Sequence, residues 1–125
     1  MRFASYVGLP FEEGGRDFSG CDCWGLVRLV YQQEAGIDLP KYCETSRERI
    51  KTVVHGERQL WREIAPGDER PLDLVLLKWR PWHIGLVVRR GLMLHMKQGQ
   101  SSMIEPYTSG RYGNLIEGFY RHECA

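Results

Sequence analysis

Residues 22–36 read DCWGLVRLVYQQEAG and carry a clear helical pattern. Apolar residues at positions 26, 27, 30 and 31 recur three or four residues apart, which is the spacing of one helix face. Asp22 is a favourable N-cap, and Gly36 is a favourable residue after the last turn. We therefore predict a helix that begins at Cys23 and ends near Gly36.

Cys23 lies in the first turn of this helix. The unpaired backbone N–H groups and the helix dipole at that end stabilise negative charge and so favour a thiolate. Positions 23, 27 and 30 share one face, and because Val27 and Val30 are apolar, this face is expected to pack inward. Cys23 is therefore either a core residue or an activated nucleophile.

The rest of the chain changes character near residue 66. Thr45 and Glu48 have the spacing of a capping box, so a second helix is predicted from about Thr45 to Gly56. Residues 57–64, ERQLWREI, are interpreted as a short helical piece. Apolar segments separated by turn residues follow and are predicted to be strands: Leu72–Trp79, Ile84–Val88, Leu92–Met96, Ser102–Glu105 and Leu115–Tyr120.

Helices followed by strands indicate an α+β fold, with the N-terminal helix packed on an antiparallel β-sheet meander. The 125 residues suffice for a single domain, 1–125. A formal charge of +1 and the lack of a basic run argue against a nucleic-acid partner. No apolar stretch approaches the roughly 18 residues of a membrane span, so no membrane insertion is expected.

The N-terminal residues MRFASYVGLPFEEGG lack the apolar segment of a secretory signal. We therefore expect a protein that is cytoplasmic as synthesised. In that compartment free thiols are expected for all four cysteines: Cys21, Cys23, Cys43 and Cys124.

Two histidines lie on neighbouring predicted strands. His83 opens one strand, with Gly85 leaving space beside it, and His95 lies among apolar residues of the next. A cysteine with an imidazole base that is oriented by a second polar group is an activated nucleophile. His55 and His122 lie in charged stretches and are predicted to be exposed.

The two rings can meet only if the hairpin register allows it. If His83 and His95 are directly opposite, opposed residue numbers sum to 178 and Val87 faces Gly91. A two-residue turn at Arg89-Arg90 would send the two rings to opposite faces. We therefore predict an odd-numbered loop or a bulge between the strands.

Zinc is a competing interpretation of the same side chains. Cys21, Cys23, His83 and His95 would supply two sulfur and two nitrogen ligands. The Cys-x-Cys spacing is tighter than the usual ligand spacing, however, and the pair straddles a helix start. Neither a metal nor a cofactor is expected.

Motifs along most of the chain resemble NlpC-type cell-wall cysteine peptidases, which belong to the papain-like superfamily. The residues that carry this resemblance are, in chain order, Tyr6-Val7-Gly8-Leu9-Pro10-Phe11, Gly14-Gly15, Asp22-Cys23-Trp24-Gly25-Leu26-Val27, Pro66-Gly67-Asp68, Leu74–Leu77, His83-Ile84-Gly85 and Leu94-His95. The Cys-Trp pair, the upstream Gly-Arg-Asp and the ending Gly118–His122 are most similar to the phage and prophage tail-assembly branch.

This resemblance implies a papain-like fold and hydrolysis of an amide bond in the peptide stems of peptidoglycan, commonly between D-glutamate and a diamino acid. By position, Cys23 would be the nucleophile, His83 the general base and acid, and His95 the residue that orients His83. The tail branch further implies phage tail proteins as partners and the virion tail as a location.

Two departures from the family pattern concern substrate binding. Many members carry a Ser after the Cys and a Tyr after the early Pro, and these hydroxyls help the preceding Asp to hold the free amine of the stem peptide. Here Trp24 and Phe11 take these places, Asp22 is kept, and Trp82 extends the aromatic surface. We expect less dependence on a free amine, unless Trp24 simply packs under the helix.

Two other functions fit the same sequence. One is a non-catalytic tail-tip assembly or structural protein that retains the fold. The other is an acyltransferase on this fold, for which the sequence offers no particular support. The intact set of Cys23, His83 and His95 favours a peptidase.

Overall fold

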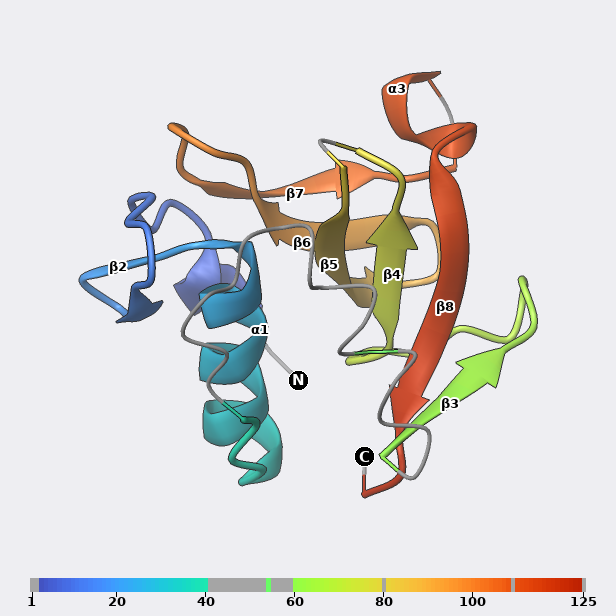
Figure 1. Ribbon diagram of the computed structural model, residues 1–125, viewed down its shortest axis with the longest axis horizontal. Helices are drawn as coiled ribbons and strands as arrows, with labels where there is room; N and C mark the ends of the chain where they lie inside the picture. Colours follow the sequence, from blue (N-terminus) through green and yellow to red (C-terminus); the bar gives the residue numbers. More distant parts are fainter. Residues whose placement is uncertain (1–2, 41–53, 55–59, 80, 109, 125) are drawn as a thin grey trace.

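The computed structural model describes residues 3–40, 54, 60–79, 81–108 and 110–124. A helix, α1 (Cys23–Val30), lies against a six-stranded antiparallel sheet of order β3-β8-β4-β5-β6-β7 (Figure 1). The strands are β3 (Trp61–Ile64), β4 (Leu74–Leu77), β5 (His83–Arg89), β6 (Leu92–Met96), β7 (Ser102–Pro106) and β8 (Ile116–His122). The other elements are η1 (Ala4–Tyr6), β1 (Arg16–Asp17), β2 (Gly20–Cys21), η2 (Tyr31–Ala35) and α3 (Gly110–Gly113). The fold is α+β, as predicted.

The predicted helix at residues 23–36 is confirmed, with a change in its last turns. Asp22 caps it, because one carboxylate oxygen accepts the Gly25 N–H at 2.7 Å. After Val30 the helix widens to a π-helix, η2, and it ends at Gly36 with a left-handed φ of 66°. The helix predicted at Thr45–Gly56 lies outside the described residues, apart from the buried Val54.

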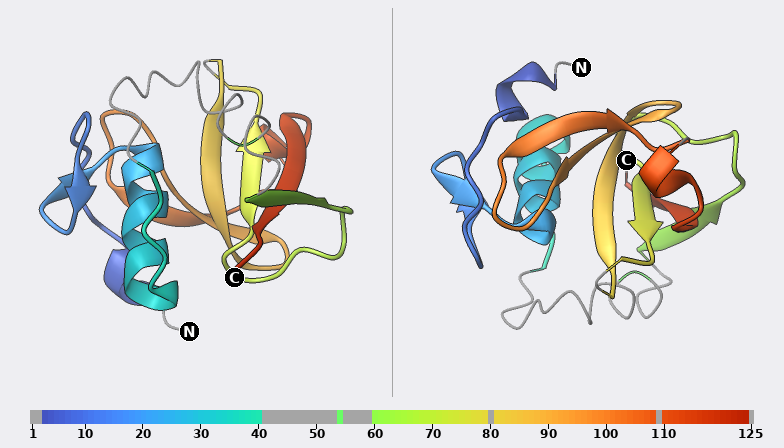
Figure 2. Two further views of the ribbon diagram at one scale, coloured as in Figure 1. Left: turned by 60° about the horizontal axis from the view of Figure 1, so that its bottom comes forward. Right: turned by 90° about the horizontal axis from the view of Figure 1, so that it is seen from above.

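α1 lies between the β1–β2 hairpin and the sheet (Figure 2). It packs against β5 and β6, the strands that carry the two histidines. Val27 and Val30 are at most 1% exposed and form a core with alternate residues of the sheet, such as Leu74 and Leu86. The inward packing of the face that carries Cys23 is therefore confirmed.

Glycines let the hairpin approach the start of α1 closely. A Cβ on Gly25 would lie 1.8 Å from the Gly15 carbonyl oxygen, and one on Gly15 would lie 2.5 Å from the Gly20 carbonyl oxygen. Backbone atoms thus fill the space that side chains would need. This close packing fixes the first turn of α1, and with it Cys23, against the hairpin.

Gly25→Ala is expected to destabilise the protein by about 3 kcal/mol or more, because the added methyl forces the hairpin away from α1. Gly36→Ala is a matched control: its added methyl meets no atom within 4 Å, so only the left-handed backbone costs free energy. That cost is about 1 kcal/mol. Urea unfolding of both variants measures the difference. Equal free energies of unfolding would contradict the packing argument.

The sheet is a meander only in part. β4, β5, β6 and β7 are consecutive antiparallel neighbours, as predicted, but β8 returns to pair with β4 and lies between β4 and β3. The four residues of β4 are all 0% exposed. A strand buried in this way needs a hydrogen-bonded neighbour on each edge, and β8 supplies the second one.

The helical interpretation of residues 57–64 is wrong for residues 61–64, which form β3, while residues 57–59 lie outside the described part. β3 pairs with β8, and Trp61 packs edge-to-face on Tyr31 and His122, with ring centroids 5.7 and 4.9 Å away. This tertiary contact outweighs the local pattern. His122 is 5% exposed, so its predicted exposure is also wrong.

Candidate active site

His83 and His95 lie on the same face of adjacent strands. Opposed residues of β5 and β6 sum to 180 in the pairs Gly85–His95 and Val87–Met93, and the register shifts between Val87 and Arg89. The predicted bulge is therefore confirmed. Direct opposition of the histidines is wrong, because His95 faces Gly85 and is diagonal to His83. The even sum still keeps both rings on one face.

The two rings form a direct hydrogen bond. His83 Nε2 lies 2.8 Å from His95 Nδ1, and both side chains are 0% exposed. Gly85 leaves the room for this diagonal contact, since a Cβ there would lie 3.1 Å from Met93 Sδ and 3.4 Å from the His95 Cβ. The space that Gly85 was predicted to leave beside His83 is thus occupied by the His95 side chain.

Glu105 on β7 continues the chain of hydrogen bonds. Its Oε1 lies 2.8 Å from His95 Nε2, accepts the Tyr112 hydroxyl at 3.0 Å, and lies 3.4 Å from Lys97 Nζ. The sequence placed Glu105 on a strand but gave it no role. A carboxylate on the strand after His95, directly after Met103 and Ile104, was the available signal.

Burial and hydrogen bonds set the charges of this chain in opposite directions. Burial lowers the pKa of His95 below its usual 6.5, and the hydrogen bond and charge of Glu105 offset only part of that effect. Burial alone would raise the pKa of Glu105, but hydrogen bonds from His95 and Tyr112 hold it below 4.5. At neutral pH the chain therefore contains a neutral His95 and a charged Glu105.

These charges fix where the protons sit, as assigned from the hydrogen-bond network. A charged Glu105 only accepts, so His95 carries its proton on Nε2 and its Nδ1 is an acceptor. His83 must then donate from Nε2. In the neutral form of His83 the other ring nitrogen, Nδ1, is then the unprotonated, basic atom.

Aromatic rings shield the two histidines. Trp79 meets the His83 ring edge-on at 4.9 Å between centroids, and Tyr112 meets the His95 ring at 5.4 Å. Water is thereby kept from the pair, which strengthens hydrogen bonds between them.

Stability is expected to fall as the pH drops below about 6.5. The unfolded chain takes up the His95 proton near that pH, whereas folded His95 stays neutral to lower pH, so protonation favours unfolding. The expected loss is at most about 1.4 kcal/mol per pH unit for this one group. Urea unfolding of wild type and His95→Gln at about pH 7.5 and about pH 5.5 isolates it. The same acid sensitivity in His95→Gln would contradict this assignment.

The described cysteines differ in environment. Cys23 begins α1 and is 7% exposed, whereas Cys124 is exposed. Burial and the charges of Asp22 and Asp17 raise the pKa of Cys21 to about 12, which keeps this thiol protonated. Because a protonated thiol is a poor nucleophile, Cys21 is excluded as the nucleophile. Cys43 lies outside the described residues.

The zinc alternative would require existing contacts to break. Both ring nitrogens of His95 are engaged, one with His83 and the other with Glu105. Within the described ranges, no three His, Cys, Asp or Glu side chains are placed to hold a metal ion.

Among the helices of the described residues, none is long and apolar enough to cross a membrane.

Of the four predicted substrate-binding residues, Asp22 and Trp24 lie at the start of α1. Asp22 accepts Gly25 N–H and, at 2.9 Å, Gly14 N–H, so each carboxylate oxygen already has a donor. Trp24 is 3% exposed and donates its indole N–H to the Pro40 carbonyl at 3.2 Å, which is the packing alternative. Phe11 and Trp82 are half-buried and pack on the same core.

A helix that begins at a buried cysteine and packs on an antiparallel sheet bearing a histidine pair is the architecture of papain-like cysteine peptidases. Within that class, the model of the NlpC/P60 family matches residues 8–119. The chain belongs to the NlpC/P60 family.

Similar proteins include the murein DD-endopeptidase MepS/murein LD-carboxypeptidase of Escherichia coli, which is 24% identical over 117 residues. That match covers 89% of this chain and 56% of the relative, so this chain spans about half the relative's length. Two solved structures share the fold. The NlpC/p60 domain of the peptidoglycan hydrolase SagA has a TM-score of 0.65 at 21% identity, covering 94% of this chain and 91% of that one.

The second structure is RipD of Mycobacterium tuberculosis, described as a non-catalytic NlpC/p60 domain protein adapted to peptidoglycan binding. It has a TM-score of 0.64 at 21% identity and covers 95% of this chain and 89% of that one. The same fold thus occurs in a hydrolase and in a binding protein.

Proposed function

We propose that this chain is a cysteine peptidase that hydrolyses an amide bond in peptidoglycan stem peptides. The observation that carries the proposal is the hydrogen-bonded series from buried His83 through buried His95 to half-buried Glu105. The two histidines lie on β5 and β6, the strands that pack against α1. A buried histidine pair backed by a carboxylate, with its pKa values shifted by burial and by specific partners, is typical of a functional site.

In the proposed mechanism, Cys23 attacks the carbonyl carbon of the scissile amide. His83 Nδ1 takes the thiol proton, and a thioester forms when the amide C–N bond breaks and the leaving amine receives that proton. His83 then takes a proton from water, whose oxygen attacks the thioester and releases the acid and the free thiol. Backbone N–H groups at the start of α1 stabilise the oxyanion.

The bond between D-glutamate and a diamino acid is proposed from the family resemblance. Purified peptidoglycan incubated with wild type and with Cys23→Ala, followed by mass spectrometry of released fragments, tests both activity and bond. New termini at that bond, made by wild type alone, support the proposal. Fragments made equally by both proteins, or by neither, would overturn it.

A free amine on the stem peptide is expected to matter little for binding. Both oxygens of Asp22 already accept backbone hydrogen bonds, and Phe11 and Trp24 offer no acceptor. We expect a stem peptide with a free N-terminus and its N-acetylated form to be cleaved within about threefold of each other. A strong preference for the free amine, lost on acetylation, would contradict this expectation.

A non-catalytic assembly protein of a phage or prophage tail is the second candidate. The departures at Phe11 and Trp24 favour it, because they remove hydroxyls that grip substrate in relatives. The tail setting itself is proposed from the resemblance of Gly118–His122 and of the Cys-Trp pair. Detection of the protein in purified virions would support the tail setting, and its absence there would overturn it.

A further inference from the structure

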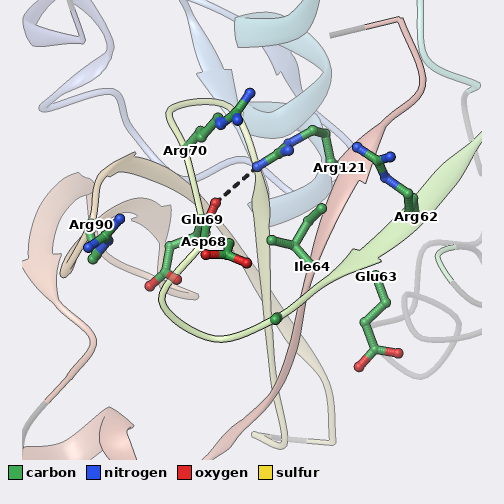
Figure 3. A pocket seen from close by; sticks show the side chains of 9 residues that line it. Arg62, Glu63, Ile64, Asp68, Glu69, Arg70, Arg90 and Arg121 are labelled. Carbon is green, nitrogen blue, oxygen red and sulfur yellow. Dashed lines mark hydrogen bonds between the residues drawn. The ribbon is translucent and has the colours of Figure 1, made fainter.

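Four arginines line a hollow of about 600 Å³ (Figure 3). Arg90 lies at the turn after β5, whereas His83 begins that strand, so the separation along the strand is roughly 23 Å. The hollow is thus distinct from the candidate active site. Its lining is Arg62, Glu63, Ile64, Ala65, Asp68, Glu69, Arg70, Arg90 and Arg121.

Two of these arginines face each other across a strand pair. Arg62 on β3 and Arg121 on β8 are directly opposed in register, so their side chains leave the same face of the sheet. Like charges in this position are destabilising unless something compensates them.

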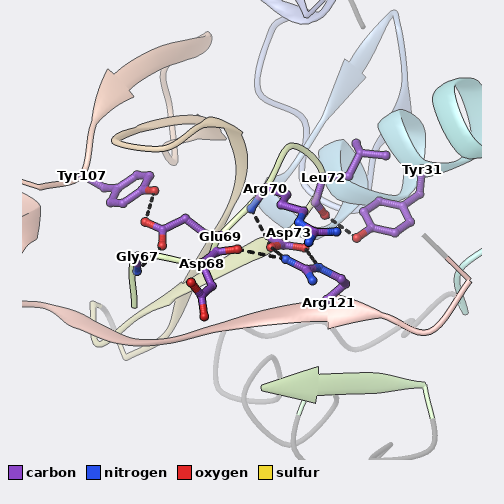
Figure 4. Close-up of polar contacts among 9 residues, drawn as sticks. All are labelled: Tyr31, Gly67, Asp68, Glu69, Arg70, Leu72, Asp73, Tyr107 and Arg121. Carbon is purple, nitrogen blue, oxygen red and sulfur yellow. Dashed lines mark hydrogen bonds and ion pairs between the residues drawn. The ribbon is translucent and has the colours of Figure 1, made fainter. Parts of the chain in front are cut away.

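Arg121 is held in place by one carboxylate. Its Nε and Nη2 each donate to Asp73 at 2.9 Å, and Nη2 also donates to the Asp68 carbonyl at 3.1 Å (Figure 4). Asp73 accepts the Arg70 backbone N–H as well, at 2.8 Å. The Asp73 carboxylate therefore neutralises Arg121 and holds its side chain in one position at the edge of the hollow.

The other acidic residues of the hollow compensate the arginines unevenly, and the Arg90 charge acts on Glu69. Glu69 is 7% exposed and accepts hydrogen bonds from Gly67 N–H and the Tyr107 hydroxyl, and Glu63 points away from the arginines in Figure 3. Within the described ranges, three arginines of the hollow form no ion pair within 4.0 Å: Arg62, Arg70 and Arg90. Arg62 and Arg70 therefore keep more of their charge available to a ligand than Arg121 or Arg90 does.

We propose that this arginine pocket binds a ligand bearing phosphate groups, a function separate from peptide hydrolysis. Guanidinium groups pair bidentately with oxyanions, and the arginines approach from two strands and two turns. A tetrahedral phosphate offers oxygens in all these directions, whereas a planar carboxylate offers them in one plane. The volume accommodates more than one phosphate group.

Isothermal titration calorimetry with inorganic tripolyphosphate, at low ionic strength, tests the proposal. We expect saturable 1:1 binding that Arg62→Gln and Arg70→Gln each weaken at least about tenfold. Arg89→Gln is the matched control, because Arg89 is exposed and adjacent to Arg90 but does not line the hollow. Its affinity should stay within about twofold of wild type.

Three results would overturn the proposal: no saturable binding, an equal loss of affinity in Arg89→Gln, or equally tight binding of citrate, which would indicate general attraction of anions. Circular dichroism of each variant verifies that it is folded. Hydrolysis of stem peptide by the Arg62 and Arg70 variants should match wild type, so the two proposals fail independently.

Discussion

Cys23→Ser is expected to lower the rate of stem-peptide hydrolysis at least about a thousandfold, with the fold retained. A serine hydroxyl fits the space of the thiol, but it does not ionise at neutral pH and the helix start cannot activate it as a thiolate. Because substrate contacts are unchanged, the loss should appear in kcat rather than in KM. Steady-state cleavage of a purified stem peptide measures both.

Cys124→Ser is the matched control for this variant and should retain wild-type activity, since Cys124 is exposed and lies at the far end of the chain. A limiting dose of iodoacetamide at about pH 6 should label Cys23 before the other thiols. Full activity in Cys23→Ser, or first labelling of Cys21 or Cys124, would remove Cys23 from the mechanism.

The helix and the two histidine strands could be predicted because their signals are local. The cap at Asp22, the apolar spacing after Cys23 and the stop at Gly36 all lie within one segment of chain. The bulge in the hairpin could also be predicted. Side chains alternate between the two faces of a strand, so the two rings share a face only if opposed residue numbers have an even sum.

Features that depend on which strands meet could not be predicted in this way. β8 pairs with β4 across a long stretch of chain, and Trp61 becomes part of a strand only because β8 offers it an edge. Glu105 meets His95 through the β6–β7 register, in which His95 faces Met103. The arginine pocket likewise gathers residues from positions 62 to 121, so the clustering of its arginines could not be predicted from local sequence.

Glu105→Gln is expected to reduce kcat/KM about 10- to 100-fold, the usual effect of losing a partner behind a functional histidine. The amide oxygen can still accept the His95 Nε2 proton, so the geometry survives while the negative charge is lost. Glu105→Leu removes the acceptor as well and frees His95 to change tautomer. The kcat/KM of that variant should fall roughly a thousandfold, because a changed His95 tautomer lets the His83 proton move to Nδ1, the atom that must accept the thiol proton.

The pH profile separates this positioning role from simple packing. In wild type the Glu105 carboxylate stabilises the protonated histidine pair that forms as Cys23 loses its proton, so Glu105→Gln should move the alkaline limb of the kcat/KM profile to lower pH. Glu123→Gln, at an exposed carboxylate, should leave rate and profile unchanged. A Glu105→Gln enzyme with lower rate but an unmoved profile would reduce Glu105 to a packing residue. A wild-type rate would show that the proton positions along the histidine pair are set without it.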